Sequence, residues 1–188
     1  MRDGAETKRR IERAALHLFV EKGVTQTTIR DITKAVGITE GALYRHFESK
    51  DELASTLFVD NYQTFAEELE RTRNSQSGIV NQMTAMIRMF CAFFDRDPDL
   101  FSYLLLAQHD AGRQAPADIK SPVNVVRRTI ADAVDRGDVE AGDTEFLTSV
   151  VLGIVLQVAI SKIYGHLDGD LSSRCEAISA ACTRAIGL

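Results

Sequence analysis

Apolar residues recur along this chain mainly at intervals of three and four, the spacing of one face of an α-helix. The clearest case lies between residues 5 and 22, and Gly23 is a natural end for that helix. Its apolar stripe consists of Ile11, Ala14, Ala15, Leu18 and Phe19. In contrast, no run of residues alternates with the period of two that a half-buried strand requires. The pattern therefore predicts an all-α protein.

Two short helical patterns around a glycine-containing turn follow this first helix. Thr27 or Thr28 can cap a helix, and the pattern breaks at residues 36–38, the tripeptide Val-Gly-Ile. The apolar side of that helix consists of Ile29, Ile32 and Ala35. Thr39 is the expected N-cap of the next helix. Two residues four apart anchor this helix in a core, Leu43 and Phe47. The arrangement is a helix-turn-helix, in which the second helix enters the major groove of DNA.

A further start signal opens a long helix immediately afterwards. Ser49 is an N-cap and Glu52 lies at the third helical position, so together they form a capping box for a helix that extends to about Arg73. Five more helical patterns follow, and Pro98 and Pro122 each stand as first helical residue after a capping residue. These patterns cover about 79–94, 98–106, 121–137, 144–165 and 171–186. The sequence thus predicts nine helices.

Three motifs, TTIRDI, AVGITEGALYRHF and SKDEL, occur here in the order and at the spacing of a known DNA-binding domain. From Ile11 to Leu57 the chain closely resembles the TetR (tetracycline repressor) family of bacterial regulators. Beyond Leu57 the resemblance is one of helical layout and length. It implies a helix-turn-helix DNA-binding domain over residues 1–48 and a helical ligand-binding and dimerisation domain over residues 49–188.

The resemblance and the outward face of the third helix together indicate which residues bind DNA. Arg45 is the best direct base reader, because its guanidinium can pair with O6 and N7 of guanine. Tyr44, His46 and Lys50 occupy positions that resemble the family's contacts to the DNA backbone. Glu40 departs from the Lys or Arg often found at its position, and either accepts from a cytosine amine or only suits the helix N-terminus. The expected set is Thr28, Thr39, Glu40, Gly41, Ala42, Tyr44, Arg45, His46 and Lys50.

The body of the chain is rich in Phe and Met at helical spacing, which has two interpretations. Such stripes usually fill a core, but they can also line a cavity that holds a few polar anchors. The resemblance implies a cavity of this kind for a lipophilic or aromatic small molecule. The candidate ligand-binding residues are Phe58, Tyr62, Phe65, Met86, Phe90, Phe93, Tyr103, Gln108, His109 and Gln157.

The last two predicted helices carry broad apolar faces and small residues that permit close helix approach. In the family, the equivalent pair meets its symmetry mate as a four-helix bundle, which implies a homodimer; the alternative is burial within one chain. The expected interface contains Val150, Ile154, Val158, Ile178 and Ala181. Phe146 to Ser161 is a run of sixteen uncharged residues. Because a bilayer requires ~20 residues, we expect a helix buried between partners rather than a membrane span.

Charge is distributed unevenly, which changes the meaning of the net value of −5. Residues 1–50 hold ten Lys and Arg against seven Asp and Glu, whereas the remainder holds twelve against twenty. The basic character therefore lies in the predicted helix-turn-helix, and the body repels phosphate. Three cysteines, Cys91, Cys175 and Cys182, form no metal-binding or disulfide pattern. The odd count fits a reducing cytoplasm, and we interpret Cys175 and Cys182, seven apart on one helical face, as core residues, with redox sensing as the alternative.

No pattern in the sequence indicates an enzyme. The chain lacks a glycine-rich phosphate loop, an HExxH motif and a nucleophile elbow, and its four histidines are scattered. We expect no cofactor and no metal. The resemblance implies a cytoplasmic homodimeric repressor that binds a palindromic double-stranded DNA operator and is released by a small hydrophobic or aromatic effector. The alternative from another class is a soluble helical carrier or sensor of hydrophobic ligands that does not act through DNA.

Overall fold

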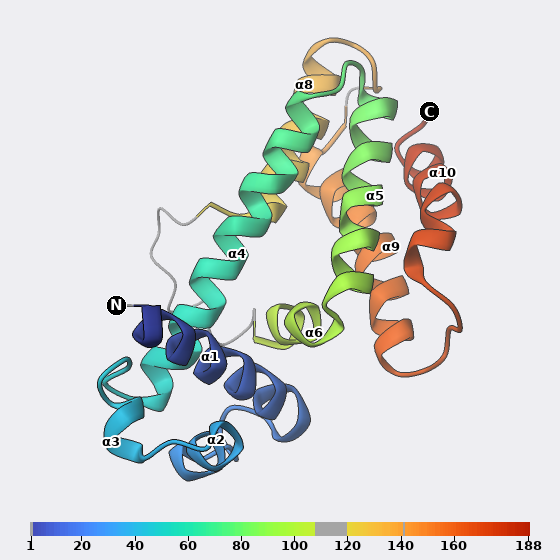
Figure 1. Ribbon diagram of the computed structural model, residues 1–188. Helices are drawn as coiled ribbons and strands as arrows, with labels where there is room; N and C mark the ends of the chain where they lie inside the picture. The colour runs from blue at the N-terminus through green and yellow to red at the C-terminus, as the bar shows by residue number, and fades with distance from the viewer. Residues whose placement is uncertain (1, 108–119, 141) are drawn as a thin grey trace. The chain divides into compact units, whose positions relative to one another are not determined.

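The computed structural model describes residues 2–107, 120–140 and 142–188 of the chain (Figure 1). Within these residues it contains nine α-helices, one 3-10 helix and no strand, which confirms the predicted fold class and number of helices. The elements are α1 (Arg2–Lys22), α2 (Ile29–Val36), α3 (Glu40–Leu43), α4 (Lys50–Asn74), α5 (Ile79–Arg96), α6 (Pro98–Ala107), α8 (Pro122–Asp135), α9 (Thr144–Ile163), η1 (Leu171–Arg174) and α10 (Cys175–Ala185).

The helices form two compact units, and α4 begins in the first and ends in the second. The first unit contains the residues up to Asn61 together with α6 from Asp99 onward. The second unit contains Tyr62–Pro98 and the residues from Lys120 onward. The domain boundary that we predict after residue 48 falls inside the first unit, because the first turns of α4 pack there as well.

The core of the first unit is built on α1. Its buried side chains are Ile11, Ala15, Leu16 and Phe19, so the predicted stripe is present and widened by Leu16. On α2, Val36 is buried, whereas Ala35, which we assigned to the apolar side, is exposed. That assignment was wrong because Val36, one position later, faces the core. Tyr103 of α6 stacks on Phe19 with ring centroids 5.8 Å apart, and its hydroxyl donates to the Ala54 carbonyl oxygen over 2.7 Å.

Helix starts in the first unit follow the capping signals of the sequence. Thr28 caps α2 with a complete capping box: its hydroxyl oxygen accepts from the Asp31 amide, and the Asp31 carboxylate accepts from the Thr28 amide. At α4 the Ser49 hydroxyl oxygen accepts from the Glu52 amide over 3.0 Å, as the sequence predicts. The return bond differs, since the Glu52 carboxylate accepts from the amide of Glu48 rather than from that of Ser49.

The second unit is arranged around α5, which packs against α8, η1 and α10 (Figure 1). Helix α9 packs against α8 and α10. Near the end of α5, the Asp95 carboxylate accepts hydrogen bonds from the amides of Leu171 and Ser172, over 2.9 and 2.8 Å. Asp95 therefore ties the C-terminal end of α5 to the start of η1. Burial alone raises the pKa of Asp95, but these hydrogen bonds from Ser172 and Leu171 outweigh it and lower the pKa below its ordinary value.

Candidate nucleic-acid interface

The helix-turn-helix is held by local backbone chemistry at each end of its turn. Helix α2 ends at Gly37, which adopts the left-handed conformation with φ of 77°, and its amide donates to the Thr33 carbonyl over 2.8 Å. A side chain would be strained at that φ, so glycine permits the sharp change of direction. Thr39 then caps α3, because its hydroxyl oxygen accepts from the Ala42 amide over 3.2 Å. Two signals in the sequence thus fix where the chain turns.

Helix α3 is short, and two side chains orient it. It contains four residues, Glu40–Leu43, and the Tyr44 amide still donates to the Glu40 carbonyl over 2.9 Å. The chain then tightens, since the amide of His46 donates to the carbonyl of Leu43 over 2.8 Å, three residues back. Leu43 and Phe47 are buried, which confirms them as the anchors of this segment in the core. The opposite side of α3 consequently faces solvent.

The residues that we expect to bind DNA lie mostly on this outward side. Tyr44 is 49% exposed although it is a large aromatic residue, and Ala42 and His46 beside it are half-buried. A Cβ atom built on Gly41 would contact nothing within 4 Å, so the surface is low and open there. The exposed members of the set are Thr28, Thr39, Glu40, Gly41, Tyr44 and Arg45. Their DNA contacts remain predictions.

One expected contact residue, Lys50, has other partners in the structure. Its ammonium donates to the carbonyl oxygens of Val24, Thr25 and Thr27, over 2.6, 3.2 and 2.8 Å. An ammonium has three N–H donors, so these three bonds use its whole donor capacity. Lys50 thus bonds the turn between α1 and α2, which is 23 to 26 residues away in sequence.

A residue that our sequence analysis omitted also lies at this surface. Arg30, in the first turn of α2, has a side chain that is 87% exposed, and its Nε lies 3.7 Å from Oε1 of Glu40. The sequence contains a signal for Arg30 as a surface residue of the helix-turn-helix, because Arg30 belongs to the TTIRDI motif and follows the N-cap Thr28 by two positions. The pair also gives Glu40 a partner within the protein, in addition to the two roles we considered for it.

The basic face of α1 is largely engaged with the protein itself. Arg10 donates through Nη2 to the Val36 carbonyl over 2.5 Å, at the C-terminal end of α2. Lys8 lies 3.5 Å from Glu12 and 5.6 Å from the centre of the Phe47 ring. Such contacts join α1 to the other helices of the unit, and they reduce the number of cations available to phosphate.

The segment that contains this geometry also matches a family of known proteins. Residues 11–57, from the core of α1 into α4, match the family described as bacterial regulatory proteins, tetR family. This segment is therefore a helix-turn-helix of the TetR family. The HTH-type transcriptional repressor KstR2 of Mycobacterium tuberculosis is 33% identical over 104 residues, which are 54% of this chain and 49% of the repressor. The chain therefore spans about half the length of that relative.

Two further comparisons extend over most of the chain at lower identity. The fatty acid metabolism regulator protein of Bacillus subtilis is 20% identical over 163 residues, 85% of this chain and 79% of that protein. The crystal structure of FadR from Bacillus subtilis in complex with stearoyl-CoA has a TM-score of 0.77 at 17% identity, and the match covers 95% of this chain and 98% of that one. At this identity the structural likeness shows a shared fold.

The ligand-binding candidates of this chain are divided between its two units. Phe58 and Tyr103 belong to the first unit, and both are buried. In the second unit, Phe65, Met86, Phe90 and Phe93 are buried, Tyr62 is half-buried and Gln157 is exposed. Phe65 and Phe93 pack with ring centroids 4.7 Å apart. Gln108 and His109 lie outside the described residues. Both interpretations of the aromatic and Met stripe, core and cavity lining, therefore stay open.

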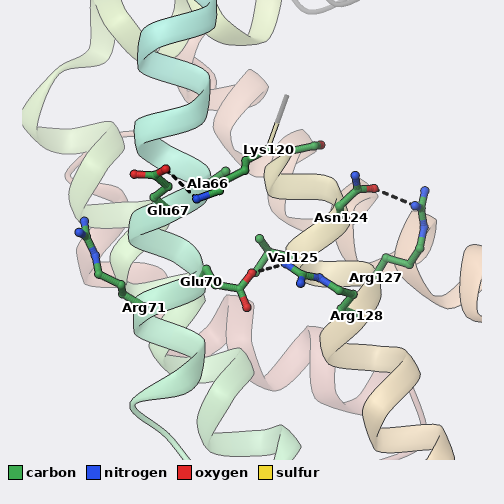
Figure 2. Close-up of a pocket in the computed structure, with 10 residues that line it drawn as sticks. Ala66, Glu67, Glu70, Arg71, Lys120, Asn124, Val125, Arg127 and Arg128 are labelled. Atoms are coloured by element: carbon green, nitrogen blue, oxygen red, sulfur yellow. Dashed lines mark hydrogen bonds and ion pairs between the residues drawn. The ribbon is translucent and has the colours of Figure 1, made fainter. Parts of the chain in front are cut away.

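A groove of 780 Å³ runs between α4 and the segment 120–128 in the second unit, and none of the predicted ligand-binding residues lines it (Figure 2). Lys120, which precedes α8, donates to Glu67 over 2.8 Å, and Arg128 of α8 donates to Glu70, so two ion pairs reach the carboxylates of α4. Arg73 of α4 and Asp132 of α8 form a third ion pair with the charges reversed. These ion pairs join α4 to α8 and to the residue pair that precedes it.

The residues that we expect at a dimer interface lie on two helices of the second unit. Val150, Ile154, Val158 and Ala181 are half-buried, whereas Ile178 is 5% exposed and already packed within one chain. These four keep apolar surface at solvent, and Phe146 on the same helix as three of them is 64% exposed.

Helix α9 is apolar around its whole circumference. It is the one helix in the described part of the chain that is long and apolar enough to cross a membrane, with 20 residues, a mean hydropathy of 2.0 and 22% of its apolar window buried. The helix is longer than the run of sixteen uncharged residues because it also includes Glu145 and Lys162 at its ends, and its burial between partners stays a prediction. The hydroxyl groups of Thr148 and Ser149 donate to the carbonyl oxygens of Thr144 and Glu145 one turn earlier, so both groups have partners within the helix.

Proposed function

We propose that this protein is a homodimeric transcriptional repressor that binds a palindromic DNA operator through α3 and the start of α2. The observation that carries the proposal is the outward face of α3, where Tyr44 and Arg45 are exposed while Leu43 and Phe47 lie in the core. A helix held in this way presents its polar side to the major groove. The match of residues 11–57 to the TetR family supports the same function.

Arg45 is the residue to which we assign base reading. It is exposed and makes no hydrogen bond or ion pair with any described residue, so its guanidinium is available to a ligand. A bidentate contact between an arginine and guanine contributes about 1–3 kcal/mol of discrimination. Thr39 and Gly41, on the same face, allow the helix to approach the base edges closely.

A single DNA-binding head, that is residues 1–50 of one chain, would bind DNA weakly. The proposed function therefore requires the dimer. Residues 1–50 have a net charge of only +3, from ten basic and seven acidic residues, and several of the basic groups bond the protein itself. Two heads joined in one molecule bind adjacent half-sites with a high effective concentration. In a symmetric dimer the recognition helices would reach successive major grooves about 34–36 Å apart.

We assign dimerisation to the exposed side of α9 and to α10. A helix with apolar residues on all sides needs cover on all sides, and one chain covers only one side of α9. A second copy of the chain, related by a two-fold axis, would supply the missing cover through a four-helix bundle.

The effector that we propose is a lipophilic small molecule, and a long-chain acyl compound is the first candidate. One regulator that matches most of this chain is named for fatty acid metabolism, and FadR from Bacillus subtilis was solved with stearoyl-CoA. The aromatic and Met residues of α5 supply apolar surface in the second unit. Ligand binding would lower operator affinity by as much as the ligand prefers the released state over the bound state.

The direct test is selection of DNA from a library of random duplexes, together with a gel-shift assay on the region upstream of the chain's own gene. We expect a palindromic motif and binding that weakens steeply with salt. Arg45→Ala should abolish selection, and Arg71→Ala, an exposed arginine on the second unit, is the matched control that should retain it. Failure of the wild-type protein to enrich any motif would refute the repressor and leave the ligand carrier.

A further inference from the structure

The three hydrogen bonds of Lys50 join the first residue of α4 to the segment that precedes α2. The carbonyls of Val24, Thr25 and Thr27 lie between the helices α1 and α2, and all three converge on one ammonium within 3.2 Å. Hydrogen bonds from a charged donor are stronger than neutral ones, and several acceptors around one cation hold the backbone in a single arrangement. Lys50 is only half-exposed, so water competes poorly for these donors.

The same turn is fixed from its other side by Thr27. Its buried hydroxyl lies 2.9 Å from the Gly23 carbonyl oxygen and 3.2 Å from the Leu18 carbonyl oxygen, which connects the turn to the end of α1. Thr27 is therefore held through its side chain by α1 and through its carbonyl by Lys50. The next residue, Thr28, is the N-cap of α2, and Arg30 follows in the first turn. The position of Lys50 consequently determines where the start of α2 lies.

We propose that Lys50 contributes to DNA binding as a positioning residue, by latching the start of α2 to the start of α4, and not as a cation that contacts phosphate. The inference rests on the proposed DNA-binding function. A phosphate contact would require the ammonium to release at least one of the three carbonyls, whereas the positioning role uses all three bonds as they stand. Because Lys50 is the first residue of α4, a displacement of that helix start moves the α2 N-terminus or breaks the three bonds.

Two substitutions separate the latch from a phosphate contact. Lys50→Arg keeps the positive charge, but a planar guanidinium cannot direct its donors to three carbonyls that converge on one point. Lys50→Met keeps an unbranched chain and removes the charge. Ser49→Ala is the matched control, since it weakens the same helix start and leaves the ammonium bonds in place. All are to be compared as full-length proteins, below their unfolding transition.

The measurement is the affinity for the duplex that the wild-type protein selects from random DNA, as a function of salt. If Lys50 acts as a positioning residue, Lys50→Arg and Lys50→Met both weaken DNA binding by about tenfold, and the slope of log K against log salt concentration stays at the wild-type value. With a phosphate contact, Lys50→Arg binds as the wild type does, and Lys50→Met lowers the slope by about 0.9 for each head. The second pattern would overturn the proposal.

Hydrogen exchange in the free protein gives a readout that does not depend on DNA. We expect both Lys50 variants to accelerate amide exchange over residues 24–31, which include the turn and the first turn of α2, and Ser49→Ala to leave those amides as protected as in the wild type. Unchanged protection in Lys50→Met would overturn the latch even if DNA binding falls. If the wild-type protein selects no duplex while its amides respond as expected, the repressor function fails and the DNA role of Lys50 fails with it.

Discussion

Gly153 lies in the middle of α9, where a larger side chain should stabilise the separate chain and weaken the association of two chains. The residue is exposed, and a Cβ atom built there would contact nothing within 4 Å in the chain. Its φ is not in the left-handed region, so alanine fits the backbone without strain. Glycine inside a helix is less favourable than alanine by about 0.8–1.0 kcal/mol. Gly153→Ala should therefore stabilise the separate chain by about that amount.

The dimer should respond in the other direction to a larger side chain at the same place. Leucine has nearly the helix propensity of alanine, so Gly153→Leu keeps most of the gain in folding. At a close helix–helix contact, however, extra methylene groups cost about 1–3 kcal/mol. Two-fold symmetry places the substitution on both copies, so the total cost is about 2–6 kcal/mol and the dimer dissociation constant should rise by roughly 30-fold to 20,000-fold.

Sedimentation equilibrium measures the dimer constant, and urea unfolding at concentrations below that constant measures the stability of the chain. Gly4→Leu, at an exposed and open glycine of α1, is the control for adding an apolar side chain elsewhere. If Gly153→Leu forms dimers as tight as those of the wild type, α9 is not packed closely at the interface. If Gly153→Ala destabilises the separated chain, its surface is not open and the reasoning from the single chain is wrong.

Three other predictions follow from individual contacts. The pKa of Asp95 is lowered in the folded protein, so its hydrogen bonds stabilise the fold fully above the unfolded pKa of about 3.9, and this stabilisation is lost as the pH falls through the folded pKa. Asp95→Asn should therefore lower the free energy of unfolding in urea by about 1.5–3 kcal/mol at neutral pH. The variant should also lose less stability than the wild type when the pH is lowered. Glu40→Gln should release Arg30 from its ion pair and raise the affinity for all DNA duplexes by up to about fivefold, since an exposed ion pair contributes at most about 1 kcal/mol. A loss of affinity confined to the selected duplex would instead mean that Glu40 contacts a base. Burial raises the pKa of Cys91 to about 12 and that of Cys182 to about 11, so iodoacetamide at pH 8 should label Cys175 and spare both; rapid labelling of Cys91 in the folded protein would contradict its burial.

Local signals allowed the helices to be predicted from the sequence. Capping residues act within four positions of a helix start, so Thr28, Thr39 and Ser49 could be identified without knowledge of any tertiary contact. On α2 the buried residue is Val36 and not the predicted Ala35, which shows the limit of such patterns. In a helix of eight residues, several apolar positions are compatible with one face, and packing against α1 selects among them.

Contacts between distant residues could not be predicted in the same way. The partners of Lys50 lie 23 to 26 residues before it, and nothing in the sequence around Lys50 points to three backbone carbonyls. The family resemblance supplied a role for this position, and the structure supplies a different partner. Arg30 is the converse case, because it was visible in a motif and its exposure became known only from the fold.

The ligand site could not be predicted for a physical reason. A Phe or Met stripe at helical spacing results equally from a packed core and from a cavity wall, because both require apolar side chains on one face. Phe65 and Phe93 illustrate this, since their rings pack on each other and would also suit an apolar ligand. Only a bound ligand, or a measured affinity for acyl compounds, distinguishes the two.

The distribution of cations explains why the geometry of the head should matter so much in this protein. Lys50 and Arg10 bond backbone carbonyls, and Arg30 is paired with Glu40, so few positive groups remain for phosphate although the head is basic. A small electrostatic contribution gives weak non-specific binding. Specific binding must then depend on the placement of α2 and α3 in each head and on the spacing of the two heads. Under the proposed function, we therefore expect a slight shift of the helix start at Lys50 to release DNA, because no large phosphate attraction would oppose it.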